Sequence, residues 1–126
     1  MNEQLQSDWD NQAAVLDTAV TTAKQFLAGL GNRPAAIFPE PVEVDKLPDV
    51  GLGAEGALAT FQAKYGPGLS GSPGPRYFGF VTGGATPASV AGDWLASAID
   101  QNVTADNDSS APQVETCLLY TSDAAD

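Results

Sequence analysis

The chain has 126 residues, enough for one small domain, and its hydrophobic fraction of 43% is compatible with a core. Its net charge of −11 and its five scattered Lys and Arg residues argue against nucleic acid and anionic membranes as partners, because phosphate contacts need basic side chains. The absence of histidine and the single cysteine exclude a His-based triad, an internal disulfide and a zinc site that needs imidazole or several thiolates.

Two features bear on the compartment. No apolar run approaches the roughly 20 residues of a membrane span. The first ten residues are acidic and polar, unlike a signal peptide. We therefore expect a cytoplasmic protein without membrane contact.

Residues 7–30 have the spacing of one amphipathic helix, which Ser7 or Asp8 can cap and Gly31 with Asn32 can end. Its apolar stripe comprises Trp9, Ala13, Leu16, Val20, Ala23, Leu27 and Leu30. One helix cannot bury its own stripe, so the partner is either the rest of this chain or another subunit. The spacing also resembles a coiled-coil seam, with too few heptads to specify one.

Residues 31–53 contain four prolines and predict a connector without a continuous helix. Residues 54–65 predict a second helix, since Leu58, Phe61 and Tyr65 fall on one face. The Gly, Pro and Ser residues of 66–75 predict a surface loop, which we expect to be ordered because the next residues are strongly apolar.

Residues 77–81 are aromatic and β-prone, and they predict a short extended segment. A small-residue loop, 82–85, follows, and Thr86 with Pro87 then predicts the start of a helix that ends near Asp100. An extended segment, a glycine turn and a helix N-terminus together suit a small anion, because free backbone N–H groups and the helix dipole favour negative charge. After a polar loop, Ser110 to Pro112 predicts another helix start.

The stretch from Arg76 to Asn102 reads RYFGFVTGGATPASVAGDWLASAIDQN. It resembles the segment near the N-terminus of group II pyridoxal-phosphate-dependent amino-acid decarboxylases. Bacterial members of that family carry Arg, two aromatics, Gly-Phe, a Gly-Gly-Ala-Thr-Pro loop and an Ala-Asp-Trp-Leu helix in this order. Gly92 replaces the alanine of that pattern. The resemblance implies a mainly α fragment, the N-terminal arm of a type I pyridoxal-phosphate enzyme fold whose full-length parent is α/β.

The resemblance also implies a function for the parent protein, which is a lyase that removes the carboxylate of an amino-acid substrate. Pyridoxal 5'-phosphate takes up the electrons left at Cα, and the protein supplies a Schiff-base lysine, an acid, a stacking histidine and a phosphate site. In the family these groups lie downstream. The three lysines here match no cofactor-lysine motif, so we expect no catalytic or cofactor-binding residue in this chain and no activity from it alone. The parent is expected to be a homodimer in which N-terminal helices pack against the second subunit.

The same resemblance places one wall of the substrate pocket in this chain. Phe80 and Val81 match positions that line the substrate side chain, and Thr82, Gly83 and Gly84 match the turn that approaches the substrate carboxylate. Glycines allow close backbone approach, and aromatic side chains exclude water. The alternative is that Phe80 is a core residue and that the two glycines only form a turn.

The last ten residues, Cys117 to Asp126, read CLLYTSDAAD. This string resembles the translation of a sequencing-library adapter, which has no place in fold reasoning. We therefore expect residues 1–116 to be the truncated arm and pocket segment of a decarboxylase, and residues 117–126 not to be native. The alternative is a genuine helix that continues from Gln113.

Two other functions stay open. One is a free-standing small acidic helical binding module, and the other is an aminotransferase of the same fold. The order of the GGATP and DWL motifs favours the decarboxylase. The sequence does not identify the amino-acid substrate.

Overall fold

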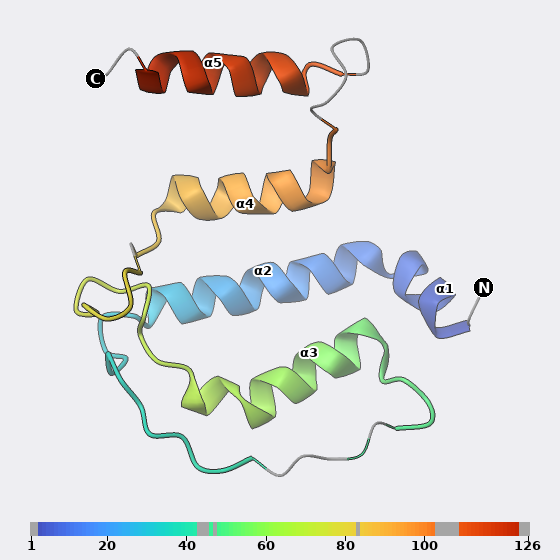
Figure 1. Ribbon diagram of the computed structural model, residues 1–126. Helices are drawn as coiled ribbons and strands as arrows, with labels where there is room; N and C mark the ends of the chain where they lie inside the picture. The colour runs from blue at the N-terminus through green and yellow to red at the C-terminus, as the bar shows by residue number, and fades with distance from the viewer. Residues whose placement is uncertain (1–2, 43–45, 47, 83, 103–108, 124–126) are drawn as a thin grey trace. The chain divides into compact units, whose positions relative to one another are not determined.

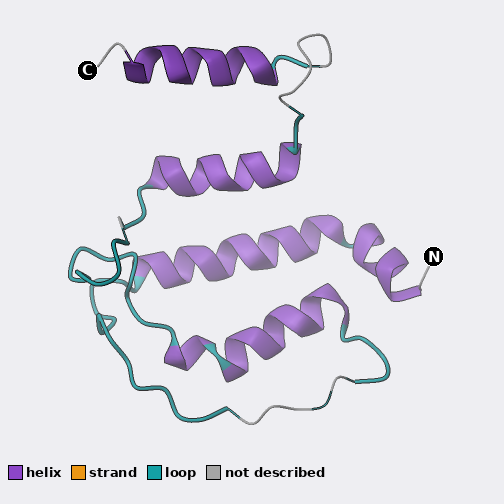
Figure 2. Cartoon of the chain, viewed as in Figure 1, coloured by secondary structure: helices purple, strands orange, loops and turns teal. Residues whose placement is uncertain are grey.

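The computed structural model describes residues 3–42, 46, 48–82, 84–102 and 109–123. These residues form five α-helices and a short 3-10 turn, and none of them lies in a strand (Figure 1; Figure 2). The elements are α1 (Glu3–Asp10), α2 (Gln12–Ala28), α3 (Gly53–Lys64), η1 (Gly66–Gly68), α4 (Pro87–Ile99) and α5 (Ala111–Asp123). The expectation of a mainly α chain is confirmed. The chain divides into two units, Met1–Gly84 and Ala85–Asp126, which we describe separately.

The single helix predicted over residues 7–30 is wrong, because two helices, α1 and α2, meet at Asn11. The Asn11 amide nitrogen Nδ2 donates to the carbonyl oxygen of Ser7 at 3.0 Å, and the Asn11 backbone N–H donates to the same carbonyl at 3.0 Å. Asparagine side chains compete in this way with the backbone for helical partners, which explains the interruption. The predicted stop is confirmed to within about a turn, since α2 ends at Ala28 and is followed by Gly29.

Helix α3 confirms the predicted helix 54–65 to within a residue at each end. Its N-terminus has no local side-chain cap, and Gly53 has φ 68°. The cap comes from α1, where Oδ1 of Asp8 accepts a hydrogen bond from the Ala54 N–H at 3.0 Å. A carboxylate at a helix N-terminus satisfies an orphan N–H and complements the dipole. Asp8 was predicted to cap its own helix, so the residue type was right and the helix wrong.

The predicted apolar stripe is covered over only part of its length. Val20, Ala23, Leu27 and Leu30 are half-buried, on the helix that packs beside α3 (Figure 1). Trp9 and Leu16 are 57% and 56% exposed. Among the described residues no hydrophobic side chain is fully buried. The intramolecular partner that the sequence left open therefore accounts for the second half of the stripe.

The loop after α3 is ordered, as predicted, and hydrogen bonds tie it to the chain that leaves α2. Nη1 of Arg33 donates to the carbonyl oxygen of Leu69 at 2.6 Å, and its guanidinium lies 4.5 Å from the centre of the Phe26 ring. Gly71 and Gly74 are buried. The Gly71 N–H donates to the Pro34 carbonyl at 2.8 Å. The Gly- and Pro-rich composition thus serves close backbone packing rather than flexibility.

In the second unit, the predicted start of α4 is confirmed in detail. Thr86 is the N-cap, its Oγ1 accepts from the Ser89 N–H at 3.2 Å, and Oγ of Ser89 accepts from the Thr86 N–H at 3.1 Å. This reciprocal pair is a capping box, and Pro87 occupies the first helical position. The helix ends at Asp100, whose φ of 43° is left-handed.

Helix α5 begins at Ala111, where the sequence predicts a helix start, and its backbone continues to Asp123. It therefore crosses the step from Thr116 to Cys117 without interruption. Helix formation depends on local propensity and not on the origin of a sequence. The adapter origin of residues 117–126 accordingly stays a prediction.

Candidate functional site

The residues predicted for the pocket wall do not form the extended segment expected at 77–81. Phe80 and Val81 have φ of 53° and 57°, in the left-handed region, and the Thr82 N–H donates to the Gly79 carbonyl at 3.3 Å. Gly79 to Thr82 is thus a tight turn with two left-handed central residues, the arrangement of a type I′ turn. The extended prediction is wrong at these positions, because β-prone residues need a neighbouring strand and the described residues offer none.

The side chains at this turn point into solvent. Phe78, Phe80 and Val81 are 95%, 92% and 103% exposed. The alternative that Phe80 is a core residue is therefore wrong for this chain. Phenylalanine and valine are among the least suitable residues for a left-handed turn, and no burial offsets the strain.

Thr82 and Gly84 complete the described part of the predicted site, and Gly83 lies outside the described residues. Oγ1 of Thr82 donates to the Gly79 carbonyl at 3.2 Å, which adds a second bond across the turn. Gly84 has φ 79°, and a Cβ built on it would lie 3.2 Å from the carbonyl oxygen of Pro73. Glycine is needed there both for the backbone angle and for the close approach.

The helix start considered for a small anion belongs to the second unit. There the capping box already satisfies the N–H groups of Thr86 and Ser89 with hydroxyl oxygens. These two N–H groups bind side chains of the capping box itself, so they are not available to a ligand. The remaining first-turn N–H groups follow the usual pattern of a helix N-terminus.

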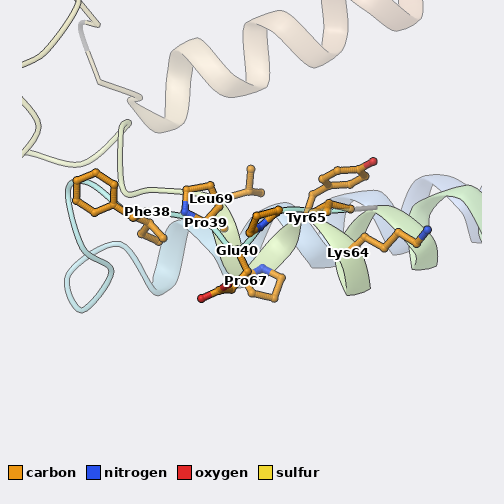
Figure 3. Close-up of a pocket in the computed structure, with 11 residues that line it drawn as sticks. Phe38, Pro39, Glu40, Lys64, Tyr65, Pro67 and Leu69 are labelled. Atoms are coloured by element: carbon orange, nitrogen blue, oxygen red, sulfur yellow. The ribbon is translucent and has the colours of Figure 1, made fainter. Parts of the chain in front are cut away.

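A groove that the sequence did not predict lies in the first unit, with a volume of about 820 Å³. It is formed by two segments, residues 37–42 of the proline-rich connector and residues 64–69 at the end of α3. Figure 3 shows Phe38 and Lys64 at opposite ends of the lining, with Pro39, Pro67 and Leu69 between them. The lining has one acid, Glu40, and one base, Lys64. Ile37 and Phe38, an apolar pair inside the proline-rich connector, are the feature of the sequence from which this groove could have been predicted.

The donor set of this chain does not fit pyridoxal phosphate. Lys24, Lys46 and Lys64 are exposed and lie on α2, in the connector and in the last turn of α3. There is no histidine to stack on a pyridine ring. The described residues also contain no cluster of three or more acidic, Cys or His side chains that could hold a metal ion. We therefore derive no chemical step from this chain.

None of the described helices combines the length and the apolar character needed to cross a bilayer. In comparisons with known proteins, no protein-family model, curated protein or solved structure matches the chain.

Proposed function

We propose that residues 1–116 are the N-terminal arm and pocket-wall segment of a pyridoxal-phosphate-dependent amino-acid decarboxylase, a cytoplasmic homodimer, and that residues 117–126 derive from a sequencing adapter. The observation that carries this proposal is the order of residues from Arg76 to Asn102. The motifs of that family follow one another here in the family's order, as Gly79-Phe80, Gly83-Gly84, Thr86-Pro87 and Asp93-Trp94-Leu95. One short motif alone would be a weak signal, because it can arise by chance. Several motifs in the same order are a strong one.

The structure supports the proposal at two points. Thr86 and Pro87 start α4 with a complete capping box, so the loop-to-helix step that the motif requires is built into the local sequence. Large apolar side chains on α1, α2 and the pocket-wall turn stay exposed, among them Trp9, Leu16 and Phe80. Contact with further polypeptide would remove these apolar side chains from water, which is favourable. An arm that packs against a larger body accounts for it better than a self-sufficient acidic module does.

The decisive experiment is to read the native gene beyond the codon for Thr116. We expect an open frame that encodes a histidine, an acid and a lysine in cofactor-binding context. A stop codon directly after Thr116 would refute the proposal and leave the acidic module. If the downstream lysine lies in a sequence typical of aminotransferases, the parent is an aminotransferase of the same fold and not a decarboxylase.

The protein encoded by that longer frame then allows a test of the pocket wall. Phe80→Ala is expected to raise KM for the amino-acid substrate and to leave bound cofactor unchanged, because the residue faces the substrate side chain. Phe38→Ala is the matched control, since Phe38 is equally exposed, at 100%, and lies outside the motif. Equal effects of the two substitutions on KM would contradict the assignment.

The 126-residue chain itself provides a further check. It is expected to retain no pyridoxal phosphate after borohydride reduction and desalting, because its three lysines lie in exposed positions and the chain has no histidine to stack on the cofactor ring. A stable reduced Schiff base at one lysine would contradict the reasoning.

A further inference from the structure

Arg76 lies one residue before the aromatic run, and its side chain reaches back to the exit of α2. Its Nη2 donates to the carbonyl oxygens of Gly31 and Arg33, both at 2.8 Å, and lies 3.5 Å from that of Leu30. These carbonyls belong to the turns that follow α2, whose last residue is Ala28, and a guanidinium with several N–H donors can bind more than one of them. Arg76 therefore joins two segments that lie 43 to 46 positions apart in the sequence.

The backbone between these segments is closely packed. The Gly74 N–H donates to the Gly71 carbonyl at 2.9 Å, and the Tyr77 N–H donates to the Gly74 carbonyl at 3.2 Å. A Cβ on Gly74 would lie 3.0 Å from the Gly71 carbonyl oxygen, so no larger residue fits without movement. Figure 1 shows this yellow-green loop beside the C-terminal end of α2. Arg76 is thus held at the base of the loop that carries the pocket-wall residues.

The far end of the same loop returns to its base. Gly84 approaches the Pro73 carbonyl so closely that an added Cβ would lie 3.2 Å from the oxygen. Gly84 therefore lies close to Pro73, and the chain must reverse between these two residues. The Gly79–Thr82 turn makes that reversal with Phe80 and Val81 in the left-handed region.

At the tip of the loop, two hydrogen bonds close the turn, from the N–H and the Oγ1 of Thr82 to the Gly79 carbonyl. Phe80 and Val81 are 92% and 103% exposed, so their side chains pack against nothing that would offset the strain. Strained backbone persists only where the surrounding structure fixes it. The two ends of the loop are held as well, at Arg76 with Tyr77 and at Gly84.

From this we infer that Arg76 is a positioning residue for the pocket wall: by binding the carbonyls at the exit of α2, it fixes the start of the loop and so imposes the left-handed turn at Phe80 and Val81. Its role in a substrate pocket rests on the proposed function. The effect of Arg76 on the backbone at Phe80 and Val81 does not depend on that function, and it can be tested in the 126-residue chain alone.

The experiment compares the full chain with Arg76→Met, Arg76→Lys and Arg33→Met by NMR. The readouts are the intraresidue amide-to-Hα NOE and the one-bond Cα–Hα coupling at Phe80 and Val81, both of which distinguish positive from negative φ. Arg33→Met is the matched control. It removes the same charge from a neighbouring arginine whose Nη1 holds Leu69 rather than the loop of residues 73–84.

In the full chain we expect positive φ at Phe80 and Val81. Arg76→Met should lose this signature while the amide shifts of α2 and α3 stay in place. Arg76→Lys should recover most of it, because an ammonium group can still donate to the same carbonyls. Arg33→Met should keep it.

Three results would overturn the inference. One is a positive-φ signature that survives in Arg76→Met, and another is its equal loss in Arg33→Met. The third is collapse of α2 and α3 in Arg76→Met, which would make Arg76 a residue of general stability. None of these results bears on whether the parent is a decarboxylase, which the downstream gene sequence decides separately.

Discussion

The N-terminus of α3 depends on one carboxylate from a distant helix, and this dependence can be measured. Substituting Asp8→Ala removes the oxygen that accepts from the Ala54 N–H at 3.0 Å. No other side-chain cap is present there. Loss of an N-cap acceptor costs about 1 kcal/mol, which is about a fivefold change in the opening equilibrium. We expect amide hydrogen exchange in the first turns of α3 to accelerate by about that factor, because local opening becomes easier.

Two further variants give the test its resolution. Asp8→Asn keeps an oxygen acceptor and loses the charge, so only the interaction with the helix dipole, about 0.3–1 kcal/mol, should be lost. Asp10→Ala is the matched control, because it removes the same charge from α1 and the Asp10 carboxylate pairs only within its own helix, with Gln6 at 3.0 Å. If Asp10→Ala accelerates exchange in α3 as much as Asp8→Ala does, net charge and not the cap is responsible, and the reasoning is wrong.

Four predictions concern α4, the loop that contains Gly84 and the chain as a whole. Thr86→Ala should accelerate exchange at the start of α4 by an amount equivalent to about 1 kcal/mol, and Ser89→Ala by less, because Thr86 accepts the N3 bond of the capping box. Gly92→Ala should raise the helical circular-dichroism signal, since nothing lies within 4 Å of the added Cβ and alanine favours a helix by about 1 kcal/mol. Gly84→Ala should instead disrupt the loop, because φ is 79° and a carbonyl lies at 3.2 Å. Thermal unfolding of the 126-residue chain should be broad, because no hydrophobic side chain of the described residues is fully buried. A single sharp transition would contradict this last expectation.

The helix boundaries that local chemistry fixes could be predicted from the sequence. Thr86 with Pro87 starts α4, and Gly66 with Pro67 ends α3, because in each case the decisive residue lies at the boundary itself. Asn11 carried an equally local signal that the apolar periodicity obscured. The Asn11 side chain bonds the Ser7 carbonyl at the point where α1 and α2 separate, and asparagine competes with the backbone for such acceptors.

The rest depends on residues that are remote in sequence. The α3 start at Gly53 has no capping residue of its own, and the missing acceptor lies 46 positions away. The aromatic run was predicted to be extended from its composition. The loop ends force Phe80 and Val81 into a turn for which their side chains are poorly suited. Composition reports what a segment prefers, and it contains no information about where the ends of a loop are held.

Asp8 and Arg76 are both charged side chains that bind main-chain groups of a segment remote in sequence. The acid lies at the N-terminus of α3, and the base lies at the exit of α2. Each binds main-chain groups, and Asp8 also matches the sign of the helix dipole at the start of α3. In a unit without a fully buried side chain among its described residues, such contacts carry more of the tertiary organisation than they would beside an apolar core.

Ionic strength tests this view within one sample. The screening length falls from about 30 Å at 0.01 M salt to about 3 Å at 1 M, so charge–dipole contacts at exposed helix ends weaken. Sodium chloride should therefore accelerate amide exchange at the first turn of α3, which a carboxylate caps. The first turn of α4 is the internal control, because the hydroxyls of Thr86 and Ser89 that cap it carry no charge. Equal acceleration at the two helix starts would mean that salt acts on the chain as a whole, and the electrostatic account of the first unit would fail.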